Sequence, residues 1–255
     1  QIADHAKWTA VNYYPYRIGS GNYYLDKSYN FGELIVDGEV NLCLHGFALK
    51  IYDGTFGLPN LITIKSGSIL NLYDCSENGT GALEKSIVIE DGATLNWYGG
   101  EVTGHITNQG NIVMQGGSAC RSITNAGGSL IVRSGRLDCD ARLGTHEYTL
   151  LKNEDHGEIA VYNAQFGSSQ YEEFWEYIIK NDADCAMAIV GGELRVSGDH
   201  LGSGILENEG DCGIYGGYFE SAVNTRILVD DRNLKIRGGK FVGYGNAGND
   251  SLIAF

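Results

Sequence analysis

The chain is poor in several residue types that other classes of protein require. It has two Pro and two Met among 255 residues, and 18 Lys plus Arg stand against 32 Asp plus Glu. The formal net charge of −14 repels phosphate backbones, anionic lipids and acidic polysaccharides. No apolar run approaches the ~20 residues that a spanning helix needs. The composition therefore argues against nucleic-acid partners and against membrane insertion.

The six Cys and six His do not form a metal-binding pattern. There is no C-x2-C pair, no H-x3-H pair and no calcium loop of the D-x-D-x-D-G kind. A G-x-S-x-G nucleophile motif and a Gly-rich phosphate loop are also missing. We therefore expect no cofactor.

Glycine and tyrosine, in contrast, are abundant. The 37 Gly are about twice the ~7% of ordinary globular chains, and 16 Tyr accompany them. This composition excludes an ordinary helical protein and favours sheet, because aromatic residues fit pleated surfaces. Hydrophobic residues make up 43% of the chain, which is enough to fill a core.

A short repeat runs through most of the sequence. Its form is apolar-x-Asn/Asp, a turn, then apolar-x-apolar-x-Gly-Gly, as in I-T-N-Q-G-N-I-V-M-Q-G-G from Ile106. Nine copies align on the first apolar residue after the turn, at Leu42, Leu70, Leu95, Ile112, Leu130, Ile159, Leu194, Cys212 and Leu234. The closest copies are 17 and 18 residues apart, so one unit has no room for a β-α-β crossover.

The repeat predicts an all-β right-handed parallel β-helix of about nine rungs. Apolar and polar residues alternate with a period of 2, as in Leu95 and Trp97 or Leu234 and Ile236, and stacking the rungs buries the apolar face. Rungs spaced by ~4.8 Å give a rod roughly 40 Å long. We expect residues 1–35 to be an N-terminal cap segment and residues 36–255 to be the β-helix domain.

Two columns of equivalent turn residues are expected to stack. The polar column, which could form a hydrogen-bonded ladder, contains Ser66, Asp91, Asn108, Asn125, Asn153, Asn208 and Asp230, and is interrupted by Val190. The Gly-Gly column contains positions 99–100, 116–117, 216–217 and 238–239, where the chain turns with positive φ or packs tightly.

In these motifs the chain resembles the surface-exposed right-handed β-helix proteins of Gram-positive, largely gut-dwelling bacteria, which share the pectin-lyase-like superfold. The resemblance is carried by His5-x-x-Trp8, G-N-Y-Y-L at 21–25, V-N-L-C-L-H-G-F-A-L at 40–49 and the I-T-N-x-G repeats. His45 and Phe47 depart from the L-C-L-N-G-H usual in that family. The resemblance implies secretion and attachment to a cell wall or a larger surface protein, but no one reaction.

One outward column is the leading candidate for ligand binding. The residues before Gly-Gly are His45, Tyr73, Tyr98, Gln115, Arg133, Tyr162, Ser197, Tyr215 and Arg237. We select Tyr98, Arg133, Tyr162 and Tyr215 as glycan contacts, because rings stack on sugars and guanidinium groups bond hydroxyls. The alternative is a structural ladder, since Tyr favours exposed strand positions anyway.

Two long insertions, at about 138–150 and 167–186, follow consecutive rungs and are expected to form a wall beside this column. In the second, Ser169 and Glu172 form a capping box. Tyr171, Phe174, Tyr177 and Ile178 then share one face of a short helix. This helix packs over the rod, or its Trp175 meets the ligand.

Candidates for covalent chemistry are sparse. Asp138 and Asp140 flank Cys139 near Arg142 and are the weak candidates for catalysis, the alternative being a solvated acidic turn. Cys120 and Cys139 fall eight and nine residues after neighbouring rung starts, so they form a disulfide or remain two buried thiols.

These observations favour a non-enzymatic extracellular module that binds glycan or another host surface ligand along one face, as part of a larger surface protein. A polysaccharide lyase or glycoside hydrolase working at the two insertions is the alternative, and a passive stalk is the third.

Overall fold

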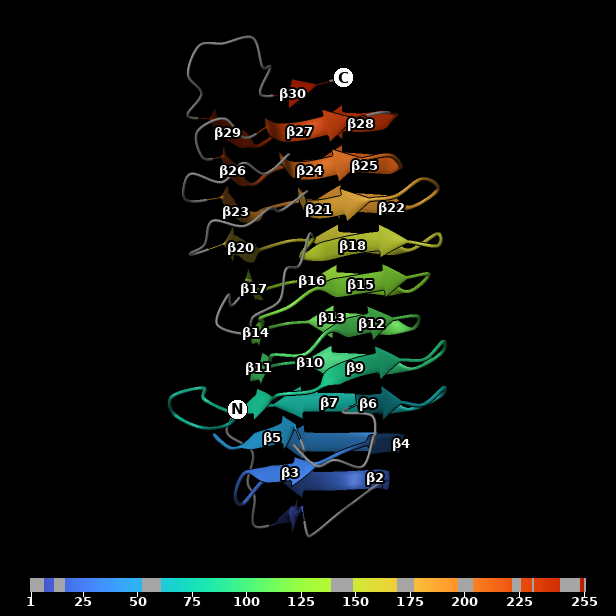
Figure 1. The fold of residues 1–255 in the computed structure, drawn as a ribbon, viewed down its shortest axis with the longest axis vertical. Helices are drawn as coiled ribbons and strands as arrows, with labels where there is room; N and C mark the ends of the chain where they lie inside the picture. Colours follow the sequence, from blue (N-terminus) through green and yellow to red (C-terminus); the bar gives the residue numbers. More distant parts are fainter. Residues whose placement is uncertain are drawn as a thin grey trace.

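The chain is wound into a rod of parallel strands in a computed structural model (Figure 1). The structure describes residues 7–11, 17–51, 61–138, 149–168, 177–196, 204–221, 226–230, 232–243 and 253–254. The described strands form one 20-stranded sheet and one 10-stranded sheet, and their pairings are parallel. The predicted right-handed parallel β-helix is confirmed.

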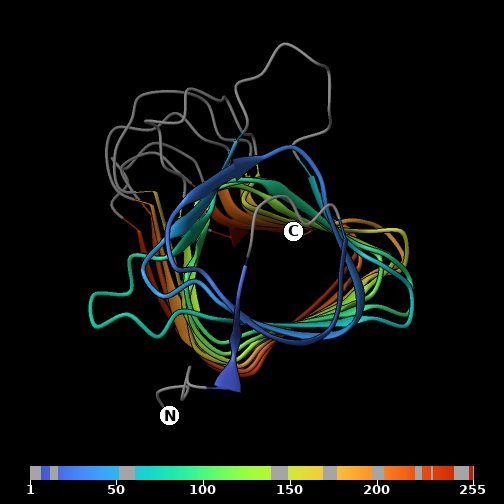
Figure 2. The same ribbon diagram turned by 90° about the horizontal axis from the view of Figure 1, so that it is seen from below.

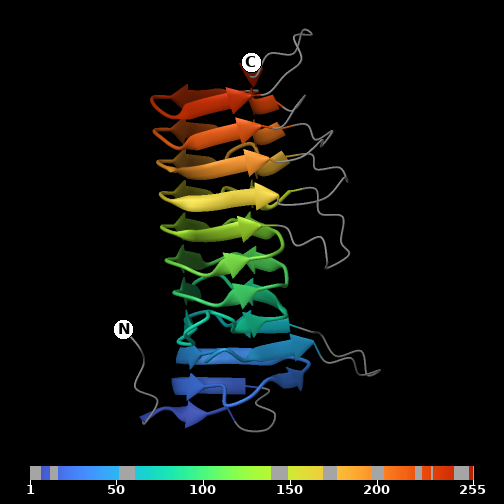
Figure 3. The same cartoon turned by 90° about the vertical axis from the view of Figure 1, so that its left-hand side faces the viewer.

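Each coil contributes strands to three columns, which Figure 3 shows stacked at even levels. Column 1 contains β6 (Leu61–Ile64), β9 (Ser86–Ile89), β12 (Ile106–Asn108), β15 (Ile123–Ala126), β18 (Leu151–Glu154), β21 (Tyr177–Asn181), β24 (Gly204–Asn208), β27 (Arg226–Asp230) and β30 (Ile253–Ala254). Column 2 contains β7 (Ile69–Tyr73), β10 (Thr94–Trp97), β13 (Asn111–Met114), β16 (Ser129–Val132), β19 (Glu158–Val161), β22 (Ala186–Ile189), β25 (Asp211–Ile214) and β28 (Asn233–Ile236).

The remaining strands complete the two sheets. β1 (Thr9–Ala10), β2 (Arg17–Tyr24) and β4 (Leu34–Cys43) belong to the sheet of columns 1 and 2. Column 3 is the second sheet, with β3 (Tyr29–Phe31), β5 (Ala48–Ile51), β8 (Ala82–Leu83), β11 (Glu101–Val102), β14 (Ser118–Ala119), β17 (Gly135–Asp138), β20 (Ala164–Ser168), β23 (Gly192–Val196), β26 (Tyr218–Ser221) and β29 (Lys240–Gly243). Seen along the rod, the coils superpose around a shared interior (Figure 2).

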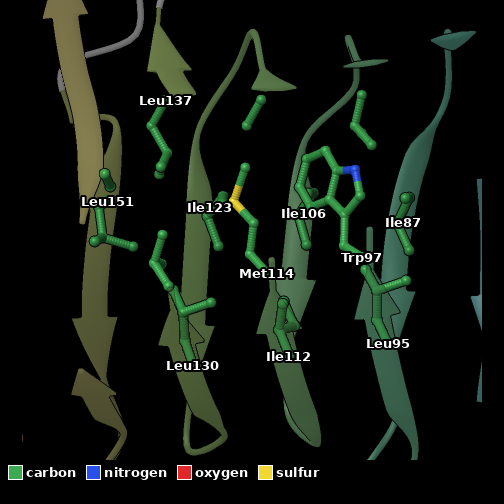
Figure 4. Close-up of a cluster of buried hydrophobic side chains, with 14 of the residues drawn as sticks. Ile87, Leu95, Trp97, Ile106, Ile112, Met114, Ile123, Leu130, Leu137 and Leu151 are labelled. Carbon is green, nitrogen blue, oxygen red and sulfur yellow. The ribbon is translucent and has the colours of Figure 1, made fainter. Parts of the chain in front are cut away.

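The interior is filled by the apolar residues of the period-2 pattern. Leu95, Trp97, Leu130 and Val132 are fully buried. Figure 4 shows this packing, in which side chains from successive coils lie beside one another between the strands. Burying each such side chain contributes about 1.5–3 kcal/mol. The Trp97 indole N–H donates to the Gly100 carbonyl at 3.2 Å, so this buried polar group is also paired.

The pattern fails at the C-terminal end of column 2. Ile236 has the inward register of its column but is 38% exposed, and Leu234 is only partly buried. β28 is the last strand of column 2 among the described residues, so no further coil of that column covers it.

The sequence alignment of the rungs is wrong at two of its nine starting points. Val40, not Leu42, pairs with Leu70, because alternation continues through the long strand β4 and offers two positions of the same parity. Met187, not Leu194, pairs with Ile159. Leu194 belongs to column 3, where E-L-R-V shows the same alternation.

The N-terminal part adds a coil that the repeat did not reveal. β2 pairs with β4 from Arg17 to Tyr24, and β3 pairs with β5, so the described residues contain ten column 3 strands against the nine rungs expected. Residues Arg17–Phe31 therefore lie in the same two sheets as the rest of the rod. The assignment of residues 1–35 as a cap stays a prediction.

The polar turn column exists as a ladder of buried amides. Side-chain Nδ2 groups donate to the next Oδ1 from Asn108 to Asn125 at 2.6 Å, Asn125 to Asn153 at 2.8 Å, Asn153 to Asn181 at 2.8 Å, Asn181 to Asn208 at 2.8 Å and Asn208 to Asp230 at 2.7 Å. All six side chains are buried. We call this set the inner amide ladder.

The membership of this column differs from the prediction at three positions. Ile64 and Ile89, not Ser66 and Asp91, occupy the equivalent place. Between Asn153 and Asn208 the column position is occupied by Asn181, not by the predicted Val190. Ser66 and Asp91 lie two residues after the ladder position, in the turn itself. The error at Val190 follows from the alignment that took Leu194 as the start of a rung.

The Gly-Gly column is confirmed and gains Gly191 and Gly192. A Cβ on Gly191 would lie 2.5 Å from the Tyr162 carbonyl oxygen of the coil before, so only Gly fits there. The second Gly of each pair has positive φ, for example 87° at Gly100 and 81° at Gly117. The first glycine is therefore required by close stacking on the preceding coil, and the second by the positive φ with which the chain turns.

The predicted helix in the second insertion is wrong at its C-terminal end. Tyr177 and Ile178 lie in β21, and Ile178 is buried in the rod rather than on a helical face. Residues 169–176, with Ser169, Tyr171, Glu172, Phe174 and Trp175, lie outside the described residues.

Candidate ligand-binding face

The outward side of column 2 carries three parallel rows of side chains. The edge row contains Ser129, Glu158, Ala186, Asp211 and Asn233. The floor row contains Ile131, Ala160, Ala188, Gly213 and Lys235. Each row arises because residues two apart in a strand share a face and parallel in-register pairing stacks them from coil to coil.

The aromatic row follows each column 2 strand. It contains Tyr73, Tyr98, Gln115, Arg133, Tyr162, Val190, Tyr215 and Arg237, linked by backbone hydrogen bonds of 2.7–2.9 Å from each amide to the preceding coil. The predicted column is thus largely correct. Cys43, not His45, pairs with Tyr73, and Val190 takes the place assigned to Ser197, which lies outside the described residues.

Three of the predicted contacts are exposed rings. Tyr98, Tyr162 and Tyr215 are 40%, 49% and 50% exposed. Tyr98 stacks on Tyr73 with centroids 4.7 Å apart and planes within 3°, so one of its faces is already covered. Arg133 and Tyr162 are neighbours in consecutive coils, as expected.

A groove of about 490 Å³ crosses this face from β16 to β28. Its lining consists of the edge and floor rows, inward-facing residues beneath them, and Tyr215. Of the predicted contacts, Tyr215 lines the groove. Arg133 and Tyr162 belong to its coils without lining it, and Tyr98 lies on the coil of β10, outside it.

Small residues create the groove. Ala160, Ala188 and Gly213 replace the larger Asn71 and Asn96 that occupy the same row in the N-terminal coils. A Cβ on Gly213 would lie 2.7 Å from Cε2 of Tyr215, so the absence of a side chain lets the ring lie across the floor. The Arg237 guanidinium lies 6.0 Å from the centre of this ring.

The groove has charged groups on its edge and at one end. Glu158 and Asp211 are exposed carboxylates of the edge row, and Asp211 Oδ1 accepts a hydrogen bond of 2.8 Å from Asn233 Nδ2. Lys235 is exposed at the C-terminal end of the floor row. The arrangement offers an apolar floor, one ring and a few polar groups, which is typical of ligand sites.

Asp138, one of the two weak catalytic candidates, lies at the end of β17, and its role stays a prediction. Its carboxylate is buried and accepts a hydrogen bond from Arg136 of the same strand, as in a structural ion pair. Asp140, Cys139 and Arg142 lie outside the described residues. Among the residues that the structure describes, no group of three His, Cys, Asp or Glu side chains is placed to hold a metal ion.

One Ser–His contact escaped the sequence reasoning. His105 Nδ1 lies 2.9 Å from Ser122 Oγ, and Arg121 Nη1 lies 3.3 Å from His105 Nε2. Because arginine only donates, Nε2 must accept, and the ring proton is then on Nδ1. His105 therefore donates to Ser122 and cannot remove its proton in this arrangement.

Cysteine pairing also differs from the sequence analysis. Cys43 and Cys75 form a disulfide with Cα atoms 6.4 Å apart, 32 residues apart in the chain. Neighbouring Asp74 links segments of two coils by accepting hydrogen bonds from the amides of Gly46, after β4, and Gly81, before β8, at 2.9 and 2.7 Å. Cys120 Sγ lies 2.8 Å from Glu101 Oε1. The predicted pairing of Cys120 with Cys139 stays a prediction.

Lys85 is a buried amine in the N-terminal coils. It is 1% exposed, and its Nζ donates to the Gly32 carbonyl at 3.0 Å. Burial lowers the pKa of Lys85 from its ordinary 10.5 to about 8, although the nearby Glu84 carboxylate partly opposes this shift. The amine lies away from the groove, and no feature of the sequence pattern indicated its burial.

The part of the chain that the structure describes has no helix long and apolar enough to cross a membrane. In comparisons with known proteins, no family model, no curated protein and no solved structure matches this chain. The fold therefore rests on the strand pairing itself, and the pectin-lyase-like and Gram-positive resemblance remains a hypothesis.

Proposed function

We propose that this chain is a non-enzymatic extracellular module that binds glycan in the groove on the outward side of column 2. The observation that carries this proposal is the groove of about 490 Å³, whose floor is small and apolar and whose side is the ring of Tyr215. Sugar rings present apolar faces and hydroxyl edges, which match an aromatic ring beside polar groups.

The location is proposed on two grounds. The Cys43–Cys75 disulfide favours an oxidising compartment outside the cytosol. The resemblance described above is the reason for assigning the module to a bacterial surface, as part of a larger protein. A rod of stacked coils suits display, because its length is set by the number of coils.

Glycan-array binding followed by affinity measurement tests the proposal. Tyr215→Ala removes the ring that lines the groove, and we expect affinity for the best-bound neutral glycan to fall about tenfold, equivalent to ~1.4 kcal/mol. Tyr98→Ala is the matched control, because Tyr98 is also an exposed ring of the same row but lies outside the groove. The control should change affinity less than twofold. Absence of glycan binding, or equal losses in the two variants, would overturn the proposal.

A further inference from the structure

The edge of the groove carries negative charge that has no counterpart beside it. Glu158 and Asp211 lie in the edge row two coils apart, with Ala186 between them, so their Cα atoms are ~9.6 Å apart. Among the described residues, no Lys, Arg or His side chain forms an ion pair with either carboxylate. Both are free to meet a cation of a ligand.

An aromatic ring faces the same part of the groove. Tyr215 follows strand β25 and its ring lies across Gly213, and Asp211 is two residues before Gly213 on the same side of that strand. A carboxylate and a ring face together favour a bound ammonium group, through an ion pair and a cation–π contact. The small floor residues Ala160 and Ala188 leave room for a sugar ring to carry that group.

The cationic side chains near the groove belong to its end coils, although Arg237 reaches to 6.0 Å from the centre of the Tyr215 ring in the neighbouring coil. Arg133 belongs to the coil of β16, whereas Lys235 and Arg237 belong to the coil of β28. Of the three coils between them, those of β19 and β25 present a carboxylate on the edge row, that of β22 presents Ala186, and none has a Lys or Arg in the three rows. A positively charged ligand is therefore favoured at the centre and opposed at the C-terminal end.

We propose that the groove binds a linear glycan with free amino groups, such as a β-1,4-linked glucosamine oligomer. This inference rests on the glycan-binding function proposed above and specifies its ligand class. The net charge of −14 acts in the same direction, since it attracts a polycation from a distance and repels uronic acid polymers.

The test compares hexamers of glucosamine, glucose and galacturonate at low salt, with hexalysine as a peptide arm. We expect the glucosamine hexamer to bind about tenfold tighter than the glucose hexamer, because two exposed ion pairs contribute modestly. The preference should shrink as salt is added. The galacturonate hexamer should bind most weakly.

Charge variants of the groove make the test specific. The double variant Glu158→Gln, Asp211→Asn should lower the ratio of glucosamine affinity to glucose affinity from about ten to about one. Lys235→Gln should raise glucosamine affinity about threefold, because it removes the opposing charge. Glu77→Gln with Asp91→Asn is the matched control, since it removes two exposed carboxylates outside the groove lining and should change the preference less than twofold.

The outcomes separate the two proposals. Equal binding of glucose and glucosamine, with loss of both in Tyr215→Ala, would overturn the amino-sugar inference and keep the glycan function. Binding of hexalysine but of no sugar would overturn both in favour of a basic peptide. Binding of none of the four probes would overturn the amino-sugar inference, and the glycan function would then be decided by the array.

Discussion

The coils before and after Ile106 differ in the residue that fills the inward position at the end of column 1. In the earlier coils the inward position at the end of column 1 is apolar, with Val36, Ile64 and Ile89 stacked in register. From Asn108 onward the same position is an amide that bonds its neighbours. One register can therefore be filled by an apolar stack or by a hydrogen-bonded ladder.

The outward side of column 2 shows the reverse arrangement. Asn22, Asn41, Asn71 and Asn96 form an amide ladder in the earlier coils, with side-chain bonds of 2.7–2.9 Å. After β10 this row changes to apolar and small residues, which produce the groove. In the coils whose amides lie inside the rod, the outer row is therefore apolar and small, and this is the face on which we propose that a ligand binds.

The largest expected effect comes from breaking the inner amide ladder. Asn153→Leu removes the donor to Asn181 Oδ1 and to the Gly157 carbonyl, both of which are in the buried stack. Leaving buried groups without partners costs about 1–3 kcal/mol each, so we expect the free energy of unfolding to fall by about 3 kcal/mol. Urea denaturation measures this change.

Asn111→Leu is the control for that variant. Asn111 is exposed in β13, outside the inner amide ladder, so the same chemical change there should cost less than about 1 kcal/mol. Equal losses in the two variants would show that the ladder contributes nothing specific to stability.

The sequence predicted the ladder but not all of its members. The motif I-T-N-x-G placed Asn108 and Asn125 in adjacent coils, as the pairing confirms. It missed Asn181, because I-I-K-N-D sits in an insertion that had been assigned to a helix. Periodicity identifies which residues point inward, but an irregular spacing leaves open which coil they belong to.

The groove illustrates a different limit. Alternation predicted an outward aromatic row, and Tyr215 is in it. The hollow beside it arises from Ala160, Ala188 and Gly213, whose small size carries no periodic signal and matters only once they are stacked. The Cys43–Cys75 disulfide was missed because its two cysteines are 32 residues apart in the chain and come together only when neighbouring coils stack.

Lys85 is the one charged residue that is buried among the described residues of the coils before Ile106. The pKa of Lys85 is lowered to about 8 in the folded chain and is 10.5 ordinarily, so the unfolded chain binds more protons between these values. The cost of burying the ammonium is present below pH 8 and is relieved as the pH rises towards 10.5. We expect the free energy of unfolding to gain about 2 kcal/mol from pH 8 to pH 10 through this group.

Lys85→Met isolates this contribution, because subtracting its pH profile removes the tyrosines and other groups that titrate in the same range. The difference between the two proteins should change in favour of the wild type as the pH rises. Parallel profiles would show that Lys85 is not desolvated in the folded chain.

The smallest expected change in stability is at the boundary where the apolar stack of the earlier coils meets the inner amide ladder. Asn108 Oδ1 is buried without a hydrogen-bond partner, and Ile89 is its register neighbour in the preceding coil. Ile89→Asn supplies a donor to that oxygen, whereas Ile64→Asn puts an amide between Val36 and Ile89 with nothing to bond. Both variants lose a buried Ile, so both should destabilise the rod.

The difference in the free energy of unfolding between these two variants measures the value of the added hydrogen bond. Ile89→Asn should be less destabilising than Ile64→Asn by about 1 kcal/mol, the net worth of one hydrogen bond. Urea denaturation of the pair measures it, with Ile64→Val and Ile89→Val as controls that shorten the side chain without adding an amide. Equal losses of stability in the two Asn variants, with equal losses in the two Val variants, would show that extending the ladder does not stabilise the rod. The choice between an amide stack and an apolar stack must then depend on the outer face.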